Sequence, residues 1–412
     1  VYAQAWRSKY YSVVIIAEEG KKIVADYTYS DPNMVVAMHH KGFAQKFADK
    51  TIFIPRFLKK VNYGTGEFNS SIAIMNTEDK STDVIVQFYE RSGQLKTEIR
   101  KNLGPFSKWG LWALADIMMS LPGGYEYSVK ITSTNTNIVA DSEMRNLSNQ
   151  DGGQIGGGFE GIPLKRLRSF YHIPIIVRNA FGIGWESSIT FQNPNNTGIS
   201  VKVELTGGNP KITRACSYNI PPLGQKEIYF PSDSCFNPTN SPLPDGIYIA
   251  QIRETSASTK VAVIYSLYSR SHRMSIIENA SDDFSMDKTL FVPRMYNNYA
   301  GSWNSSFLLA NFLDKDIDAK VTYISNNIGE RTTPNNSCGF IKIPKLSSQV
   351  VYIPYNSGQG CIPAGDVLYA GVVQTNDVIT GVYHGASKKQ DVAYNRGHGA
   401  SLFSLQEADR IY

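Results

Sequence analysis

The four cysteines are the residues with the clearest chemistry in this chain. They form two pairs, Cys216 with Cys235 and Cys338 with Cys361, and each pair encloses a loop of about 20 residues. The pairs occupy corresponding loops of a repeat described below, and none of the six histidines stands at ligand spacing from them, which argues against zinc. We therefore expect two disulfides. Disulfides form in oxidising compartments, so we expect an exported protein that is extracellular or on the cell surface.

The other reactive side chains form no catalytic or metal-binding pattern. The histidines are scattered, and no serine or cysteine stands in a nucleophile elbow. The acidic residues Asp314, Asp316 and Asp318 are similar to the first half of a calcium loop, but Ala319 and Ser325 stand where that loop needs Gly and Glu. We expect no metal, no cofactor and no enzymatic activity.

Asparagines in N-x-S/T sequons are acceptors for glycans when an exported chain meets the transferase. Two of them hold the same position in two copies of the repeat. The candidate glycosylation sites are Asn69, Asn146, Asn195, Asn279, Asn304 and Asn335.

The composition excludes several classes of protein. With 42% hydrophobic and 19% charged residues, most of the 412-residue chain is expected to fold. The net charge of +5 is small and the two signs are interleaved, so we expect no nucleic-acid partner. No apolar run reaches the roughly 18 residues that a membrane helix needs, so we expect no membrane span.

An internal repeat positions these residues. Three stretches align without a gap: FNSSIAIMNTEDKSTDVIV from Phe68, WESSITFQNPNNTGISVKV from Trp185 and WNSSFLLANFLDKDIDAKV from Trp303. Each unit also opens with an apolar segment that ends in proline, at Pro55, Pro174 and Pro293, with both spacings equal to 119. The period is about 118 residues.

The apolar segments predict β-strands. Apolar and polar residues alternate over five to eight positions, and clusters of Asn, Asp, Gly, Pro and Thr supply the turns between them. About seven short strands per repeat are typical of a two-sheet sandwich. The predicted fold class is all-β, with tandem antiparallel immunoglobulin-like β-sandwich repeats of about 118 residues.

The two ends of the chain carry parts of further units. The string Ile23–Asp26 is identical to Ile138–Asp141, which belongs to the closing hairpin of the first full unit, and SLFSLQ from Ser401 falls where another opening strand is due. The predicted domains are 1–47, the closing half of a unit with its linker; 48–147, unit one; 148–167, a flexible Gly-rich linker; 168–272, unit two; 273–286, a linker; 287–390, unit three; and 391–412, a linker with the opening or donor strand of a further unit.

Unit one has an apolar segment, from Trp109 to Met119, where the other units have their cysteine loops. Its spacing predicts a short amphipathic helix ended by Pro122. This helix either caps an open end of the sandwich or docks onto a neighbouring subunit. The residues we expect at subunit contacts are Trp109, Trp112, Met118, Met119, Leu402, Phe403 and Leu405.

The unit FVPRMYNNYAGSWNSSFLLANF, continued to VITGVYHG, resembles the tandem immunoglobulin-like repeats of exported bacterial and archaeal surface proteins. The resemblance covers nearly the whole chain. It implies a sandwich fold and a surface location, and it leaves the activity open because such repeats form adhesins, stalks and fibre subunits alike.

Two functions follow as hypotheses. In the first, the chain is a structural subunit of an extracellular filament or surface assembly and polymerises with other copies of itself, head to tail, by strand complementation. The C-terminal segment of one copy would then complete the half unit at the N-terminus of the next. In the second, the chain is a carbohydrate-binding adhesin, or a stalk segment excised from a larger surface protein, whose partners are glycans or a host cell surface.

Overall fold

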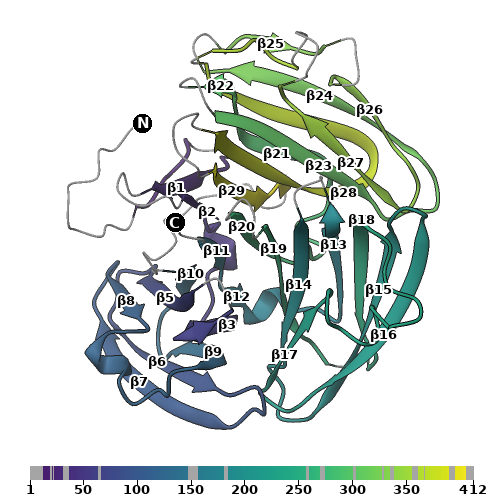
Figure 1. The fold of residues 1–412 in the computed structure, drawn as a ribbon. Coiled ribbons are helices and arrows are strands. Elements are labelled where there is room, and N and C mark those ends of the chain that lie inside the picture. Colours follow the sequence, from purple (N-terminus) through teal and green to yellow (C-terminus); the bar gives the residue numbers. More distant parts are fainter. Residues whose placement is uncertain are drawn as a thin grey trace.

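A computed structural model (Figure 1) gives the fold. It describes residues 13–404 except for short stretches at 19–20, 22, 31–36, 64–65, 147–155, 181–183, 257–258, 270–273, 300–302, 327–328, 335–337, 355–360, 366 and 389–394. The described chain is nearly all β-structure in antiparallel sheets, which confirms the predicted all-β class. Its helical turns are 3-10 segments of three residues, namely η1 (Gln45–Phe47), η2 (Asp116–Met118) and η4 (Leu164–Arg166).

Unit one consists of two sheets that enclose an apolar core. The first sheet has the order β11-β10-β5-β4, with β8 also paired to β5, and the second has the order β12-β3-β9-β6-β7. These strands are β3 (Thr51–Lys59), β4 (Val61–Asn62), β5 (Glu67–Asn76), β6 (Thr82–Tyr89), β7 (Leu95–Leu103), β8 (Lys108–Trp112), β9 (Tyr125–Ser133), β10 (Ile138–Asn146), β11 (Gly156–Glu160) and β12 (Ile162–Pro163).

Unit two repeats this arrangement with its two layers joined through β13 and β14. The order is β16-β15-β18-β13-β14-β19-β20, with β17 also paired to β14. The strands are β13 (Phe170–Ala180), β14 (Trp185–Gln192), β15 (Ile199–Gly207), β16 (Ile212–Ile220), β17 (Gln225–Tyr229), β18 (Gly246–Glu254), β19 (Ala262–Ser269) and β20 (Met274–Asn279).

Unit three is built around one long strand, β28, which pairs with β21 and β24 in its first half and with β23 and β29 in its second. The strands are β21 (Asp287–Met295), β22 (Asn297–Tyr299), β23 (Trp303–Asn311), β24 (Ile317–Ser325), β25 (Arg331–Thr332), β26 (Phe340–Ile343), β27 (Ser347–Tyr352), β28 (Tyr369–Lys388), β29 (Asn395–Ser401) and β30 (Phe403–Ser404). The remaining pair is the N-terminal hairpin, β1 (Asp26–Ser30) with β2 (Ala37–Lys41).

The repeated Ser and Pro residues have one structural role in all units. The pairing register shifts around the opening-strand proline, which has no N–H to donate to the neighbouring strand. Just beyond the shift, the hydroxyl of the first serine in the Ser-Ser pair accepts a backbone N–H. These bonds join Ser70 to Leu58 at 2.8 Å, Ser187 to Val177 at 2.8 Å and Ser305 to Tyr296 at 2.9 Å.

The repeated asparagine closes the turn that follows the Ser-Ser strand. In every unit its buried Nδ2 donates to the carbonyl four residues later, and it also donates to the carbonyls of a more distant turn. The local bonds join Asn76 to Lys80 at 2.6 Å, Asn193 to Thr197 at 2.8 Å and Asn311 to Lys315 at 2.7 Å. A buried amide with several partners fixes the backbone of this turn, which explains why the sequence repeats this residue.

The apolar cores follow the units and extend beyond their predicted ends. Phe159 and Ile162, which the sequence placed in a linker, pack into the core of unit one. Leu402 packs into the core of unit three. The segment 156–160 is therefore a buried strand, which corrects the prediction of a flexible linker there, and only the part of that segment at 148–155 lies outside the described residues.

The expected amphipathic helix in unit one is absent from the described residues at this position. Lys108–Trp112 is strand β8, which pairs with β5, and only Asp116–Met118 forms a 3-10 turn. Burial alternates along β8, with Trp109 and Leu111 inside and Gly110 outside, so the apolar spacing has the period of a strand there.

Candidate functional site: the linker ring

Four linker strands meet at the centre of the molecule, between the three units (Figure 1). They are β2, β11, β20 and β29, and β11 lies against β2 and β20 while β29 lies against β20 and β2. We call this closed arrangement the linker ring. The backbone N–H of Lys41 donates to Glu160 Oε1 at 2.8 Å, and Asn279 Nδ2 donates to the Glu160 carbonyl at 3.0 Å. Lys41, Glu160 and Asn279 follow one another at intervals of 119 positions, so equivalent positions of successive repeats touch at the ring.

The same backbone hydrogen bond recurs at all four junctions of the ring. In each, the residue directly after a linker strand donates its backbone N–H to a carbonyl of the closing strand before it. At the first junction the accepting residue, Ala25, directly precedes β1. The four bonds run from Gly42 to Ala25 at 2.9 Å, Gly161 to Ala140 at 2.7 Å, Ala280 to Val263 at 3.0 Å and Leu402 to Gly381 at 2.9 Å. The N-terminal hairpin therefore occupies a fourth position around the ring, beside three units that each contain two layers of strands.

Glycine is required where the ring strands approach one another. A Cβ atom on Gly157 would lie 2.8 Å from Ile277 Cγ1, and one on Gly158 would lie 2.1 Å from His40 Cε1. Neither distance leaves room for a side chain. The glycine-rich composition at 156–161 thus reflects close packing.

A cluster of ionisable side chains around the buried His40 lies where the N-terminal hairpin meets unit one. Tyr27 donates its hydroxyl to Asp141 at 2.6 Å, and its ring stacks on His40 with 4.8 Å between centroids. His40 Nε2 lies 3.4 Å from Glu143 Oε1. Burial lowers the pKa of His40, but Glu143, Asp141 and Glu160 outweigh it and raise the pKa to about 9. The cluster places a buried cation among carboxylates and ties the hairpin to the first unit.

The ends of the linkers form a second layer of contacts. Arg166 makes an ion pair with Asp282 at 2.6 Å, also donates to Ser285 at 2.7 Å, and lies over the ring of Phe47 at 4.6 Å. Burial raises the pKa of Asp282, but the charge of Arg166 outweighs it and the pKa is lowered overall. A small hollow opens beside these residues. Among its polar groups, Arg166 and Asp282 pair with each other and Asn279 Nδ2 donates to the Glu160 carbonyl, so these contacts fit a structural joint.

Units one and two are joined by an ion network in which Arg56 and Glu126 are buried and Arg91 is 56% exposed. Arg56 of unit one lies 3.1 Å from Glu126 Oε1 and 2.9 Å from Glu227 Oε1 of unit two, and Arg91 lies 2.8 Å from Glu126 Oε2. Burial raises the pKa of Glu126, but the charges of Arg56 and Arg91 outweigh it and lower the pKa to about 2. Two carboxylates and two guanidinium groups therefore fix how these units pack.

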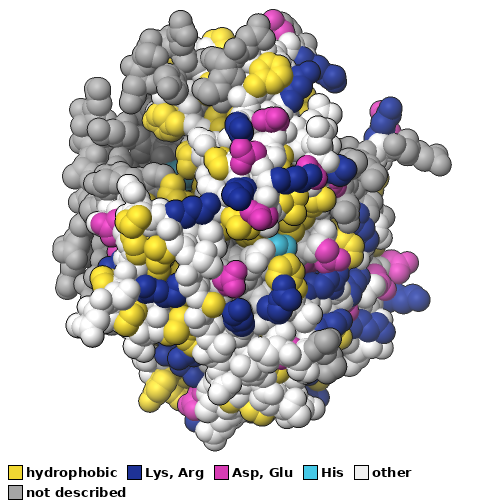
Figure 2. Space-filling model, turned by 90° about the vertical axis from the view of Figure 1, so that its right-hand side faces the viewer, with side chains coloured by type: hydrophobic (Ala, Val, Ile, Leu, Met, Phe, Trp, Pro, Cys, Tyr) yellow, Lys and Arg dark blue, Asp and Glu magenta, His cyan; other side chains and the backbone are white. Residues whose placement is uncertain are grey.

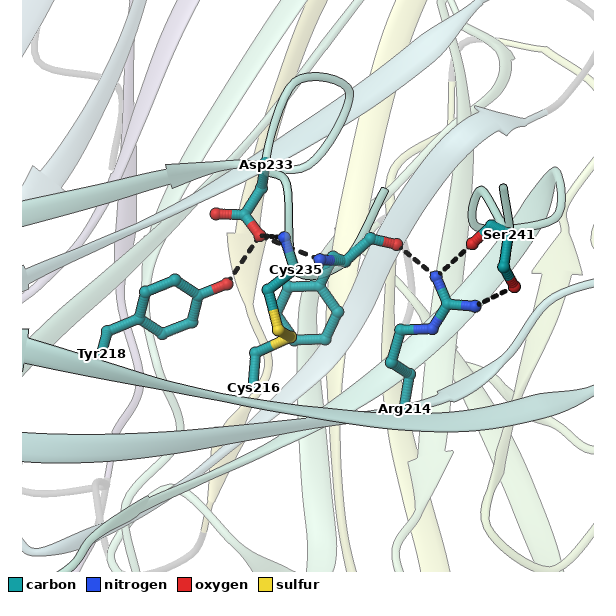
Figure 3. The surroundings of a disulfide bond; sticks show 7 residues. Arg214, Cys216, Tyr218, Asp233, Cys235 and Ser241 are labelled. Carbon is teal, nitrogen blue, oxygen red and sulfur yellow. Dashed lines mark hydrogen bonds between the residues drawn. A yellow bond between two sulfur atoms is a disulfide. The ribbon is translucent and has the colours of Figure 1, made fainter. Parts of the chain in front are cut away.

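Both predicted disulfides are present. Cys216, on edge strand β16, bonds to Cys235 with an S–S distance of 2.02 Å, and Cys338 bonds to Cys361. Around the first bond, Asp233 accepts the hydroxyl of Tyr218 at 2.7 Å and the N–H of Cys235 at 3.1 Å (Figure 3). The disulfide and these hydrogen bonds clamp a loop over the edge of the sheet.

The residues predicted at subunit contacts fall into two groups. Trp109, Met118 and Leu402 are buried in cores of their own chain, which corrects the expectation that they face a neighbour. Trp112 is half-buried under the guanidinium of Arg145, whereas Met119 is 73% exposed.

The C-terminal segment corrects a second expectation. Phe403–Ser404 form strand β30, which pairs with β21 of unit three, so this segment completes its own unit. The side chain of Phe403 and the whole of Leu405 lie outside the described residues.

The sequons differ in access. Asn69 and Asn146 are buried at 1% exposure and have no room for a glycan in the folded chain. Asn195, Asn279 and Asn304 are half-buried. Asn195 Nδ2 donates to the carbonyl of Lys260 at 2.8 Å, and the Asn304 side chain accepts the N–H of Asn298 at 2.8 Å. Asn335 lies outside the described residues.

No group of three or more His, Cys, Asp or Glu side chains able to hold a metal occurs in the described part of the chain. Asp314 and Asp316 each face a lysine, at 3.0 Å from Lys345 and 3.0 Å from Lys342. No helix among the described residues is both long and apolar enough to cross a bilayer. On the face shown in Figure 2, Lys and Arg are interspersed with Asp and Glu.

The linker ring is the feature that sequence reasoning missed. The constant spacing of 119 residues shows that the linkers are equivalent, but it does not show that they touch. Nothing in the sequence around the basic residues Lys165, Arg166 and Arg168 shows which residues they contact. Arg168 lies 2.5 Å from Asp283, and the amine of Lys165 donates to the carbonyl of Ala48 at 2.5 Å.

Comparison with known proteins gives no family. No protein-family model matches the chain, and no curated protein matches it. The crystal structure of Thermotoga maritima 1070 aligns with 28% of this chain and 95% of that chain, at 17% identity and a TM-score of 0.23. The viral chemokine binding protein R17 of rodent gammaherpesvirus Peru aligns with 91% of this chain and 89% of that chain, at 10% identity and a TM-score of 0.16. Scores this low carry no argument about fold or function.

Proposed function

We propose that the chain is a non-enzymatic structural subunit of an extracellular or cell-surface assembly, built from tandem immunoglobulin-like sandwich units. The observation that supports this best is the linker ring, where hydrogen bonds and ion pairs join residues one repeat apart. Ion pairs such as Arg166 with Asp282 and Arg56 with Glu227 join residues of different units or linkers. Two disulfides add stability of the kind that exported proteins need.

The contacts at the C-terminus change how assembly would work. Because β30 pairs with β21 of its own chain, this strand cannot also complete a neighbour without leaving unit three. Assembly through the N-terminal position of the ring needs a different partner strand.

Electron microscopy of the purified protein and labelling of intact source cells test the proposal together. We expect ordered filaments or arrays and labelling at the cell surface. Isolated particles at every concentration, or labelling only after the cells are opened, would contradict it.

One observation favours the adhesin alternative. Phe340 is 55% exposed beside a shallow hollow of unit three, which Gln374, Asn376 and Lys342 also line. An exposed ring flanked by amide and charged side chains can bind a sugar. Glycan-array binding that is lost in Phe340→Ala would support this function, and an array without signal would exclude the hollow as a glycan site.

A further inference from the structure

In each of the three units, the closing strand pairs on one side with the linker strand that follows it and on the other side with a strand of one recurring type. Strand β10 pairs with β5, β19 with β14 and β28 with β23, and these partners are the three aromatic-x-Ser-Ser strands. The N-terminal hairpin repeats the first half of this pattern. Its register aligns Asp26 with Lys41, as β10 and β11 align Asp141 with Glu160.

The hairpin lacks the second half of the pattern. Among the described residues, β1 pairs only with β2, in a two-stranded sheet, so the position that β5, β14 or β23 takes elsewhere has no strand. An unpaired strand edge presents a row of backbone N–H and C=O groups that can pair with an added strand.

Apolar side chains of the segment that precedes the hairpin are exposed where the repeat buries them. Ile16 is 66% exposed, whereas Ile131, at the equivalent position of unit one, is fully buried. Val13 is 59% exposed, and its counterpart Ser128 is fully buried. In unit one, Ile131 lies on β9 of the second sheet and packs into a core that also contains Ile72 and Ile74 of β5, whereas Ser128 Oγ donates to the Leu223 carbonyl of unit two at 3.4 Å. Ile16 therefore lacks the apolar cover to which β5 contributes in unit one.

We propose that the open edge of β1 is a strand-addition site, filled in trans by an extended segment of another chain with the pattern aromatic-x-Ser-Ser-apolar-x-apolar. The register of β10 with β5 places Ser71 opposite Glu143 and Ile72 opposite Ser142. By equivalence, the second serine of the added strand lies opposite Thr28 and its next residue opposite Tyr27.

The chain's own strands of this pattern are already used. Strand β5 pairs with β10 and β8, β14 with β19 and β17, and β23 with β28 and β27. The donor must therefore be a strand outside these three units. This inference rests on the proposed function only in taking the donor from another chain of the assembly.

Peptide binding to the full chain tests the site. The probe is a fluorescein-labelled peptide of residues 303–311, WNSSFLLAN, with a scrambled peptide of the same composition as control, followed by fluorescence anisotropy. We expect saturable one-to-one binding of the ordered peptide and binding at least about tenfold weaker for the scramble.

Two matched variants locate the binding. Ile16→Asp places a charge at the position whose counterpart, Ile131, shares a core with β5, and is expected to weaken peptide binding at least about tenfold, whereas Met119→Asp, at an exposed residue of unit one, leaves it unchanged. Val13→Asp, on the same exposed segment, serves as a second variant if Ile16→Asp unfolds. Equal binding of both peptides, no binding, or loss in Met119→Asp alone would overturn the proposal. Peptide binding without filaments would contradict the proposed function alone, and filaments without peptide binding would contradict this site alone.

Discussion

Arg294 of unit three forms an ion pair with Asp26 of the N-terminal hairpin, with 2.9 Å between Nη2 and Oδ2. Arg294 directly follows the opening-strand proline of its unit, as Arg56 does in unit one. Arg56 in turn reaches Glu227 of unit two at 2.9 Å. Equivalent arginines therefore join a unit to the next position around the ring, and the hairpin is held as the fourth position.

The first prediction concerns this ion pair. Burial raises the pKa of Asp26, and the charge of Arg294 opposes that rise. Arg294→Ala leaves the buried carboxylate without this cation and should cost on the order of 2 kcal/mol of hairpin docking. Hydrogen exchange of residues 23–30 measures it. The control is Arg100→Ala, whose side chain is 69% exposed and should cost under about 0.5 kcal/mol. Equal exchange in both variants would contradict the prediction.

The second prediction concerns the joint between units one and two. Arg56→Ala leaves Glu126 and Glu227 with only the exposed Arg91 as counter-charge and should cost roughly 3 to 5 kcal/mol in urea unfolding at neutral pH. Because Glu126 has a folded pKa below its unfolded value, its native contribution is present above about pH 4.5 and is lost as pH falls towards 2. The deficit of the variant should therefore shrink on acidification. A constant deficit between neutral and acidic pH would show that the loss is one of packing.

The third prediction is a pH dependence. The folded pKa of His40, about 9, lies above its unfolded value of 6.5. Its stabilising contribution is thus fully present below pH 6.5 and is lost as pH rises through 9. Urea unfolding across this range should show a decline in stability that His40→Gln removes. His172→Gln is the control, because burial lowers the pKa of His172 to about 4 and the ring stays neutral over that range.

Much of the fold could be predicted from the sequence because its signals are local. Alternating apolar residues identify strands, and a repeated buried Asn or Ser marks the same turn or bulge in every unit, as at Asn76 and Ser70. The disulfides followed from the repeat, since Cys216 and Cys338 stand in corresponding loops.

The candidate site could not be predicted because its contacts join residues one repeat or more apart. Nothing near Gly158 in the sequence shows that His40 packs against it. The apolar run at Trp109 and Leu111 fits a helix or a strand, and pairing with β5 decides for the strand. Leu402 was assigned to a further unit because its pattern is that of an opening strand, yet the core of unit three takes it.

The fourth prediction concerns the disulfides. Intact-mass analysis after alkylation without reductant should show no label, since the described chain has no free cysteine. Cys216→Ser with Cys235→Ser should cost about 3 kcal/mol by freeing the unfolded chain. Thermal unfolding of unit two measures this loss, and the unchanged unit three is its internal control. Label on all four cysteines would show that neither disulfide forms, and it would contradict both the expected absence of label and the expected cost of the double serine variant.

The last prediction tests whether close packing at the ring holds the molecule together. Gly158→Ala forces a Cβ to within 2.1 Å of His40 Cε1, and that ring is buried and stacked on Tyr27, so it has little room to move. We expect a loss of roughly 1 to 3 kcal/mol and faster hydrogen exchange in both the N-terminal hairpin and β11. Gly110→Ala is the matched control, because a Cβ there meets nothing within 4 Å. That variant should be neutral or slightly stabilising, since alanine restricts the unfolded chain. If the two alanine variants lose stability equally, the effect comes from the backbone of β-strands in general, and close approach at the ring does not explain why residue 158 is glycine.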